Sequence, residues 1–288
     1  LKRLNFKMNL LGIDFEDWYH PELVKKYVKD EKHEPRMFKG IDKILDILRK
    51  NDTLATFFVV GELLETNPEI FDKIVENEHE IAFHTMYHTR IDSPDFKQSF
   101  PKEIAKFSEL TNKKSKGFRA PTFSLNETSS WIIDSLSKFD YVYDSSVVPA
   151  KTDLYGLPNA QSKPYRISSN SLEKDTVDGK LIEFPLLVTK FLGKKIPAAG
   201  GFYLRSLPMR VIKNAIKNYE KQRIPASFYI HSWELTPEYM PRIELPYKEN
   251  FVTYHNINKA YGRMSELLKE FEFTSFSDYI SQGIDFFN

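Results

Sequence analysis

The sequence predicts an α/β fold, with a single (β/α) barrel as the favoured arrangement and an open doubly wound sheet as the second. Two observations carry this prediction: short apolar segments alternate with amphipathic ones almost throughout, and neither an internal repeat nor a Pro/Gly linker divides the chain. In addition, GIDFED, at the end of the first apolar segment, lacks the GxGxxG spacing of a dinucleotide site. We therefore expect one domain over residues 8–288.

The first part of the chain alternates most clearly. MNLLGID (8–14) predicts a buried strand that ends in a carboxylate, and FKGIDKILDILRKN then repeats isoleucine and leucine at helical spacing. LATFFVVG (54–61) predicts a second strand. NPEIFDKIVENE predicts a helix, with Asn67 as its N-cap and Pro68 as its first residue. HEIAF (79–83) predicts a third strand.

The rest of the chain continues this rhythm with two interruptions. Strands are expected at KGFRAP, YVYDSS, KLIEFPLLV and ASFYIHSW. Helices are expected within 95–111 and at about 128–137, 209–222 and 256–271. The segments near 151–180 and 190–207 break the pattern, and we expect them to be insertions.

Composition excludes several classes of protein. Lys and Arg number 41 against 40 Asp and Glu, so the chain lacks the basic surplus of a nucleic-acid binder. It has no cysteine, which excludes disulfides and thiolate metal sites. No apolar run is long enough to span a membrane, and MNLLGI is too short for a signal sequence. These features predict a cytoplasmic protein that could work at the inner membrane surface; they indicate no oligomeric state.

Polar side chains stand where five of the predicted strands end. In (β/α) barrels the carboxyl ends of the strands form the face that carries the active site. We therefore expect these side chains to lie close together. They are Asp14 with Glu16 and Asp17, His84 with His88, Arg119, Asp144 and His231.

Within this set, the histidine pair and the acidic cluster predict a metal site. Two imidazoles four residues apart can bind one ion such as Zn²⁺. The three carboxylates of IDFEDW would repel one another without a cation or an arginine among them. Two histidines and one carboxylate leave a coordination position open for water, as in catalytic sites. A further carboxylate could then act as general base.

The quoted segments resemble the polysaccharide deacetylase family, the NodB-homology domain of carbohydrate esterase family 4. The resemblance covers most of the chain: GIDFEDWYH, ATFFVVGELLETNPEIFDKIVENEHEIAFHTMYH, GFRAPTFSL, YVYDSSVVP, EFPLLV with GGFYLRSLP, and FYIHSWEL. It is closest to the branch with a DxEDW first motif, associated with exopolysaccharide and surface-glycan assembly. The resemblance implies a distorted (β/α) barrel that removes N-acetyl or O-acetyl groups from sugars with the help of a metal.

The resemblance also implies catalytic roles. Asp14 matches the catalytic base, and Arg119 in RAPTF matches the arginine that holds it. His231 matches the acid that protonates the leaving group, and Asp144 matches the carboxylate that orients this acid. A backbone N–H near Thr122 would stabilise the oxyanion.

For the metal, the resemblance implies His84 and His88 as ligands together with a carboxylate. The commonest family motif is TFDDG, whereas this chain has GIDFEDWY, so both Glu16 and Asp17 stay candidates. Glu16 shares the face of Asp14 if the strand alternates. Zn²⁺ is the expected ion, with Co²⁺ or Ni²⁺ as alternatives.

Aromatic and basic residues beside the motifs are candidates for substrate binding. Trp18 and Trp233 could stack on sugar rings, and Trp233, next to His231, is the stronger candidate. Arg205 could bind an anionic group of the substrate or form an ion pair at the surface. The expected partner is a glycan or glycan precursor.

Three functions are compatible with the sequence. The first is a metal-dependent sugar deacetylase. The second is a hydrolase of the same fold that acts on a non-sugar amide, which could be metal-free. The third is a glycan-binding protein without catalysis, which the presence of Asp14 and His231 argues against.

Overall fold

A nine-stranded, mostly parallel sheet forms the centre of the molecule. The structure, a computed structural model, describes residues 7–28 and 33–283. The strand order is β10-β1-β2-β3-β4-β5-β7-β6, with β11 pairing beside the start of β1. The strands are β1 (Asn9–Phe15), β2 (Thr56–Val59), β3 (Glu80–Phe83), β4 (Gly117–Phe118), β5 (Tyr143–Asp144), β6 (Tyr165–Ile167), β7 (Leu181–Glu183), β10 (Ser227–His231) and β11 (Phe273–Thr274).

The sheet curls into a distorted barrel. All of its pairs are parallel except β6 with β7. A parallel bridge between Leu186 and Ser227 brings the segment after β7 back to β10. The N–H of Leu187 donates to the carbonyl of Ser227 at 2.9 Å. The fold class predicted from the sequence is therefore confirmed.

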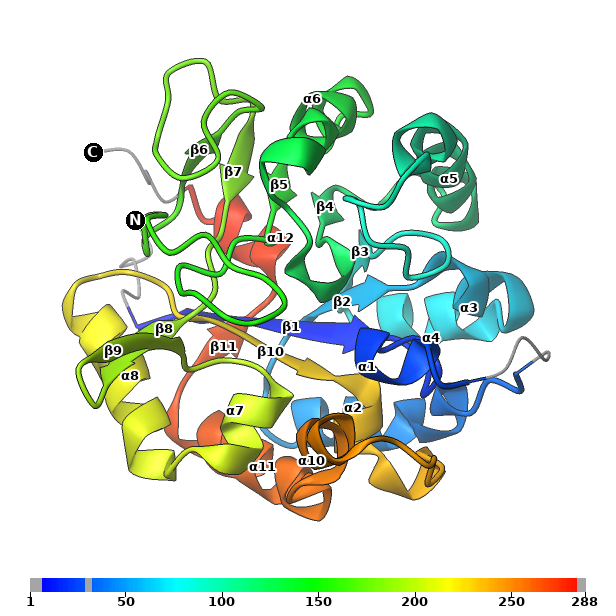
Figure 1. Cartoon of the computed structure of the whole chain (residues 1–288), viewed down its shortest axis with the longest axis vertical. Coiled ribbons are helices and arrows are strands. Elements are labelled where there is room, and N and C mark those ends of the chain that lie inside the picture. The colour runs from blue at the N-terminus through cyan, green and yellow to red at the C-terminus, as the bar shows by residue number, and fades with distance from the viewer. Residues whose placement is uncertain (1–6, 29–32, 284–288) are drawn as a thin grey trace.

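Helices surround the barrel (Figure 1). They are α1 (Glu22–Lys25), α2 (Ile41–Arg49), α3 (Gly61–Thr66), α4 (Glu69–Glu76), α5 (Phe96–Leu110), α6 (Trp131–Lys138), α7 (Gly201–Ser206), α8 (Met209–Lys221), α9 (Ser232–Leu235), α10 (Tyr247–Tyr254), α11 (Ala260–Glu270) and α12 (Phe276–Ser281). Short 3-10 turns precede some of them, including η1 (Met37–Gly40), η2 (Pro121–Phe123), η3 (Glu127–Ser129), η4 (Pro237–Tyr239) and η5 (Ile257–Lys259). None of the described helices is long and apolar enough to cross a membrane.

Side-chain alternation along β1 explains how the sequence separates core from site. Leu11, Ile13 and Phe15 are buried in the hydrophobic layer between the sheet and its helices. Leu10 faces the other way, into a smaller cluster inside the barrel. Because side chains alternate along a strand, Asp14 shares this inner face. The first strand thus carries its carboxylate into the barrel mouth.

Helix α12 closes the opposite end of the barrel, where the strands begin. Phe276 stacks on Tyr143 with ring centroids 5.2 Å apart, and its N–H donates to Thr56 Oγ1 at 3.0 Å. The N–H of Ser277 donates to Glu80 Oε2 at 2.9 Å. The pocket described below lies at the other end of the barrel, where the strands have their carboxyl ends.

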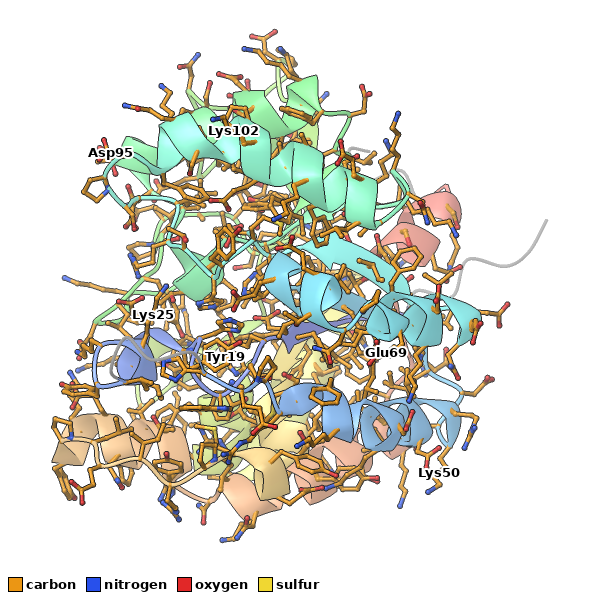
Figure 2. The ribbon with its side chains drawn as sticks, turned by 90° about the vertical axis from the view of Figure 1, so that its right-hand side faces the viewer. Tyr19, Lys25, Lys50, Glu69, Asp95 and Lys102 are labelled. Atoms are coloured by element: carbon orange, nitrogen blue, oxygen red, sulfur yellow. The ribbon has the colours of Figure 1, made fainter. Side chains whose placement is uncertain are left out.

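Strand and helix directions can be followed from the side (Figure 2). Lys25, which follows β1, and Asp95, which precedes α5, lie toward one side of the molecule, whereas Lys50, at the end of α2, lies toward the opposite side. Helices therefore begin on the side where strands end, as in βαβ units.

The structure departs from the sequence prediction in some local details. The helix α4 has Pro68, not Asn67, as its N-cap residue, and no side chain caps it. The expected insertion at 151–180 contains β6, which pairs with β7, and is otherwise irregular. The second expected insertion, 190–207, overlaps a hairpin of β8 (Val188–Phe191) and β9 (Lys194–Pro197) and then forms α7.

Candidate active site

Asp14 lies at the centre of the site, at the carboxyl end of β1. Its register partner on β10 is His231. Its Oδ1 accepts a hydrogen bond at 2.6 Å from Nη1 of Arg119, whose side chain is fully buried. Gly12 makes room for this arginine, because a Cβ there would lie 2.5 Å from Nη1. The predicted contact between Asp14 and Arg119 is therefore present.

Three buried residues near Asp14 form the candidate metal centre. Glu16, His84 and His88 each offer a ligand atom, and these atoms lie within 4.8 Å of one another. Among the described residues, no other group of three or more potential ligands is gathered in this way. Oε2 of Glu16 lies 2.6 Å from Nε2 of His88. Two histidines and a carboxylate fit a catalytic divalent site with an open position.

The protonation states of His84 and Glu16 are those that a metal ligand needs, a neutral imidazole and an ionised carboxylate. Nδ1 of His84 donates to the carbonyl of Arg119 at 2.8 Å, since a carbonyl only accepts, and this leaves the Nε2 lone pair for a metal. Burial lowers the pKa of His84 to about 4, so the ring is neutral near pH 7. Burial would raise the pKa of Glu16, but the imidazoles of His88 and His231 outweigh it and hold that pKa well below its ordinary value.

Asp17 is not part of this cluster, which corrects one of the two candidates for the metal carboxylate. Its Oδ1 accepts from the N–H of Trp18 at 2.9 Å. Its Oδ2 accepts from the N–H groups of Arg36 and Met37 at 2.7 and 2.9 Å. Asp17 therefore fixes the segment before α2, while alternation along the chain brings Glu16, two residues after Asp14, to the metal cluster.

His231 faces the metal cluster from β10. Its Nε2 lies 3.8 Å from Glu16 Oε1, and its Nδ1 donates to Glu234 Oε2 at 2.7 Å. Burial alone would lower the pKa of His231, but the carboxylates of Glu234 and Glu16 raise it to about 9. The ring is thus protonated near neutral pH.

Glu234 was not among the residues predicted from the sequence. A carboxylate three residues after the predicted acid His231, in HSWEL, is the pattern that could have indicated it. It is fully buried, three residues after His231 at the start of α9. Its Oε1 accepts from Arg205 Nε at 2.8 Å. Gly201 at the start of α7 allows this approach, because a Cβ there would lie 1.5 Å from Glu234 Oε2.

Arg205, in α7, pairs with Glu234 and also lines the active-site pocket described below. Its side chain is 1% exposed, so it is no surface ion pair. Its Nη2 donates to the carbonyl of Val252 at 2.9 Å, and its Nη1 donates to that of His255. The guanidinium therefore ties Glu234 to α10, while the expected contact with an anionic group of the substrate stays a prediction.

Asp144 does not orient His231, which corrects the role implied by the resemblance. It lies at the end of β5, opposite Glu183 on β7, and both are fully buried. Ser146 Oγ donates to Asp144 Oδ1 at 2.5 Å, and the N–H of Val147 donates to Glu183 Oε1 at 3.0 Å. Burial raises the pKa of Asp144 to about 6, and burial and Asp144 raise that of Glu183 well above its ordinary value.

The backbone around the site is strained at several residues. Thr85, His88, Thr122 and Phe123 have φ values of 57°, 51°, 53° and 49°. Positive φ is a true outlier for a β-branched residue, and such strain gathers at functional sites. The left-handed turn at Thr122 lies three residues after Arg119, and the family resemblance implies an oxyanion contact there.

A pocket of about 640 Å³ opens above these residues. Asp14, Glu16, His84, His88, Thr122, His231, Trp233 and Glu234 all line it. Trp233 stacks on His231 with ring centroids 5.0 Å apart, and its Nε1–H donates to Glu16 Oε1 at 2.9 Å. The indole N–H is therefore bound to a candidate metal ligand. Trp18 is absent from the lining, and its Nε1 donates to the carbonyl of Glu34 at 3.2 Å.

Comparison with protein families matches two adjoining parts of the chain. Residues 38–142 match the family model "Polysaccharide deacetylase". Residues 145–281 match a domain of unknown function, DUF3473. His84, His88 and Arg119 fall within the first match, and His231 and Glu234 within the second.

Curated relatives match shorter stretches. A chitooligosaccharide deacetylase from Bradyrhizobium is 38% identical over 61 residues, 21% of this chain and 26% of that protein. A peptidoglycan deacetylase-like protein from Gibberella zeae is 30% identical over 123 residues, 41% of this chain and 36% of that protein. The chain thus spans about a quarter to a third of the length of these relatives.

A solved structure matches nearly the whole fold. A protein from Mycobacterium smegmatis described as a polysaccharide deacetylase superposes with a TM-score of 0.59. The superposition covers 96% of this chain and 91% of that chain at 15% identity. At this identity the match establishes the fold alone.

Proposed function

The chain contains a domain of the polysaccharide deacetylase family, and from this premise we propose that it hydrolyses an acetyl group from a sugar of a glycan or glycan precursor. The observation that carries the proposal is one pocket in which Asp14, a buried Glu/His/His cluster and a protonated His231 face one another. Hydrolysis of an amide bond is accelerated by three groups: a base for the water, an electrophile for the carbonyl and an acid for the leaving nitrogen.

Asp14 is the proposed base. Arg119 binds only one of its oxygens, at 2.6 Å, and thereby fixes the direction of the carboxylate. In this orientation Asp14 accepts a proton from the attacking water as the oxygen of that water bonds to the acetyl carbon. The proton on Arg119 is never transferred, because guanidinium stays charged in proteins.

His231 is the proposed acid. When the carbon–nitrogen bond breaks, the sugar nitrogen would leave as a poor anion unless it receives a proton. The Nε2–H of His231 supplies this proton, and the products are acetate and the free amine. Glu234 holds Nδ1, so that the ring presents Nε2 to the pocket. For an O-acetyl group the same proton goes to the departing sugar oxygen.

The metal is proposed to be held by Glu16, His84 and His88, with Zn²⁺ first and Co²⁺ or Ni²⁺ as alternatives. When bound, such an ion supplies Lewis-acid polarisation of the acetyl carbonyl and a water of lowered pKa. A backbone N–H at the strained turn of Thr122 is the proposed second support of the oxyanion.

The experiment that tests this function is acetate release from N-acetylated chito-oligosaccharides, measured by NMR before and after chelation of metals. Release that stops on chelation and returns with Zn²⁺ supports a metal-dependent deacetylase. Release that chelation leaves unchanged contradicts the metal. No release from any sugar, with turnover of a simple amide, would favour a hydrolase of non-sugar amides.

A further inference from the structure

The β8–β9 hairpin forms a two-stranded sheet of its own, at the left of the view in Figure 1. Phe191, the last residue of β8, pairs with Lys194, the first residue of β9, so that only Leu192 and Gly193 form the turn. The mechanism proposed above uses no residue of this hairpin. Three features of its residues are unfavourable for the folded chain alone.

The first feature is the leucine at the tip of the hairpin. Leu192 has a φ of 49° and Gly193 has a φ of 78°, the positive values that a type I′ turn needs at both positions. Asparagine, aspartate or glycine normally takes the first position, because a bulky side chain is strained at positive φ. Leu192 is also 87% exposed, so burial does not compensate for this strain. The fold alone therefore explains neither the residue nor its exposure.

The second feature is a pair of lysines that face each other across the hairpin. Lys190 on β8 is the register partner of Lys195 on β9. Like charges directly opposite each other destabilise a two-stranded ladder. Among the described residues, no carboxylate forms an ion pair with Lys190, Lys194 or Lys195. Nζ of Lys195 donates to the carbonyl of Pro158 at 3.5 Å, which leaves its charge uncompensated.

The third feature is the lack of acidic residues around the hairpin in the sequence. No Asp or Glu occurs between Glu183 and Glu220, although the whole chain has 40 of them against 41 Lys and Arg. This stretch contains seven basic residues. Three of them, in α7 and α8, form ion pairs with carboxylates from elsewhere in the chain: Arg205, Lys213 and Lys217. Of the other four, three are the lysines of the hairpin.

We propose that the hairpin docks the protein on a membrane that contains anionic lipids, with Leu192 inserted among the lipids and the three lysines bound to their phosphate groups. Anionic headgroups neutralise the facing lysines and the lipid buries the leucine, so one partner accounts for both. A protein partner fits less well, since stable interfaces bury roughly 1,200–2,000 Å² and a two-residue turn is a small convex tip. A soluble polyanion would leave Leu192 in water. This inference is independent of the proposed function.

Vesicle binding by the full chain tests the docking. Flotation with vesicles of phosphatidylcholine, and of phosphatidylcholine with phosphatidylglycerol in equal parts, gives the partition coefficient at low and at high salt. Leu192→Asn removes the apolar tip and creates Asn-Gly, the pair that a type I′ turn prefers, so the hairpin keeps its fold. The charge is removed by the triple variant Lys190→Gln/Lys194→Gln/Lys195→Gln. Its matched control changes the net charge equally at three exposed lysines outside the hairpin: Lys113→Gln/Lys114→Gln/Lys116→Gln.

We expect the wild type and the control to bind the anionic vesicles, to dissociate from them as salt rises, and to bind phosphatidylcholine alone far more weakly. The partition coefficient should fall about tenfold or more in the hairpin lysine variant and about fivefold in Leu192→Asn. Equal binding of the wild type to both kinds of vesicle, or binding to neither, overturns the proposal. Binding that survives in both hairpin variants, or that is lost only in the control, does so as well.

Insertion of the tip has a readout of its own, because the chain contains no cysteine. Leu192→Cys accepts a single thiol-reactive, environment-sensitive dye, and Val177→Cys, at a position that is 80% exposed, is the matched control. With anionic vesicles the emission of the dye at position 192 should shift to the blue, and the emission at position 177 should stay unchanged. No shift at position 192, or equal shifts at the two positions, would contradict docking through the hairpin.

Discussion

Two pairs of adjacent strands, β1 with β10 and β5 with β7, each end in two titratable side chains that face each other. The surroundings of the two pairs differ. On β1 and β10, Asp14 and His231 are register partners, and each has an ionic partner of its own, Arg119 and Glu234. On β5 and β7, Asp144 and Glu183 are register partners with the same charge. Asp14 and His231 line the active-site pocket of about 640 Å³, whereas Asp144 and Glu183 do not.

The two carboxylates at these strand ends, Asp14 and Asp144, differ in the groups that face them. Asp14 is held through one oxygen by the guanidinium of Arg119 and lines the same pocket as the candidate metal ligands Glu16, His84 and His88. Asp144 faces another carboxylate, that of Glu183, and both side chains are fully buried, so the two acids cannot both ionise cheaply. Asp14 and Asp144 both lie at a strand end. They differ in the residue that faces them and in whether they line the pocket.

The largest expected effect comes from Asp14→Asn. An amide of the same shape keeps the packing but cannot accept the proton of water, so kcat should fall by about 10²- to 10⁴-fold. Steady-state acetate release measures this, with metal content as the control. A variant that keeps wild-type kcat while its metal stays bound would remove Asp14 from the role of base.

A smaller loss is expected from Glu234→Gln. Without this carboxylate the pKa of His231 falls from about 9, so His231 loses its proton at a lower pH. The alkaline limb of the pH–rate profile therefore shifts to lower pH. We expect kcat at its optimum to fall at least about tenfold, because the ring is also less well oriented.

Asp144→Asn is the matched comparison for Glu234→Gln. Because Asp144 faces Glu183 instead of His231, the alkaline limb should stay in place in this variant. A downward shift of the limb in Asp144→Asn, with none in Glu234→Gln, would restore the role that the family resemblance implied for Asp144.

The smallest expected effect is on stability, from Glu183→Gln. An acid whose pKa is raised on folding binds its proton more tightly in the folded state. The free energy of unfolding therefore falls as pH rises from the unfolded pKa, about 4, through the folded pKa of Asp144, about 6. Removing one of the two acids should flatten this fall.

Urea unfolding at pH 5 and pH 8 measures this effect. Relative to the wild type, Glu183→Gln should gain about 1–2 kcal/mol between the two pH values. Parallel curves for the two proteins would show that the carboxylates do not share a proton.

Much of the fold could be predicted from the sequence, because the apolar period of each segment is local. β1, α5 and α8 lie where alternation and helical spacing indicate them, and the family resemblance seen in the motifs is confirmed by the match of residues 38–142. The predicted cap of α4 differs by one residue from the observed one, because Asn67 is the C-cap residue of the preceding helix α3 and Pro68 is the N-cap residue of α4. The bridge from Leu186 to Ser227 joins segments 41 residues apart, and no local pattern encodes it.

The site could be predicted where a role depends on strand alternation and not where it depends on contacts across the barrel. Glu16 follows from alternation with Asp14. The contact between Glu234 and Arg205 joins residues 29 positions apart. The sequence therefore left two places open for Arg205, an anionic group of the substrate or a surface ion pair, and the family resemblance implied Asp144 as the orienting carboxylate. Two signals were available: Glu234 stands three residues after His231 in HSWEL, and position 201 is a glycine, whose missing Cβ makes room for the Glu234 carboxylate.

The central claim, that Glu16, His84 and His88 form a metal centre from which Asp17 is absent, is tested most directly by metal content. Wild type, Glu16→Gln and Asp17→Asn would be loaded with Zn²⁺, desalted and measured by elemental mass spectrometry. We expect about one ion per chain in the wild type and in Asp17→Asn, and a clear loss in Glu16→Gln. Full metal content in Glu16→Gln with loss in Asp17→Asn would contradict the account.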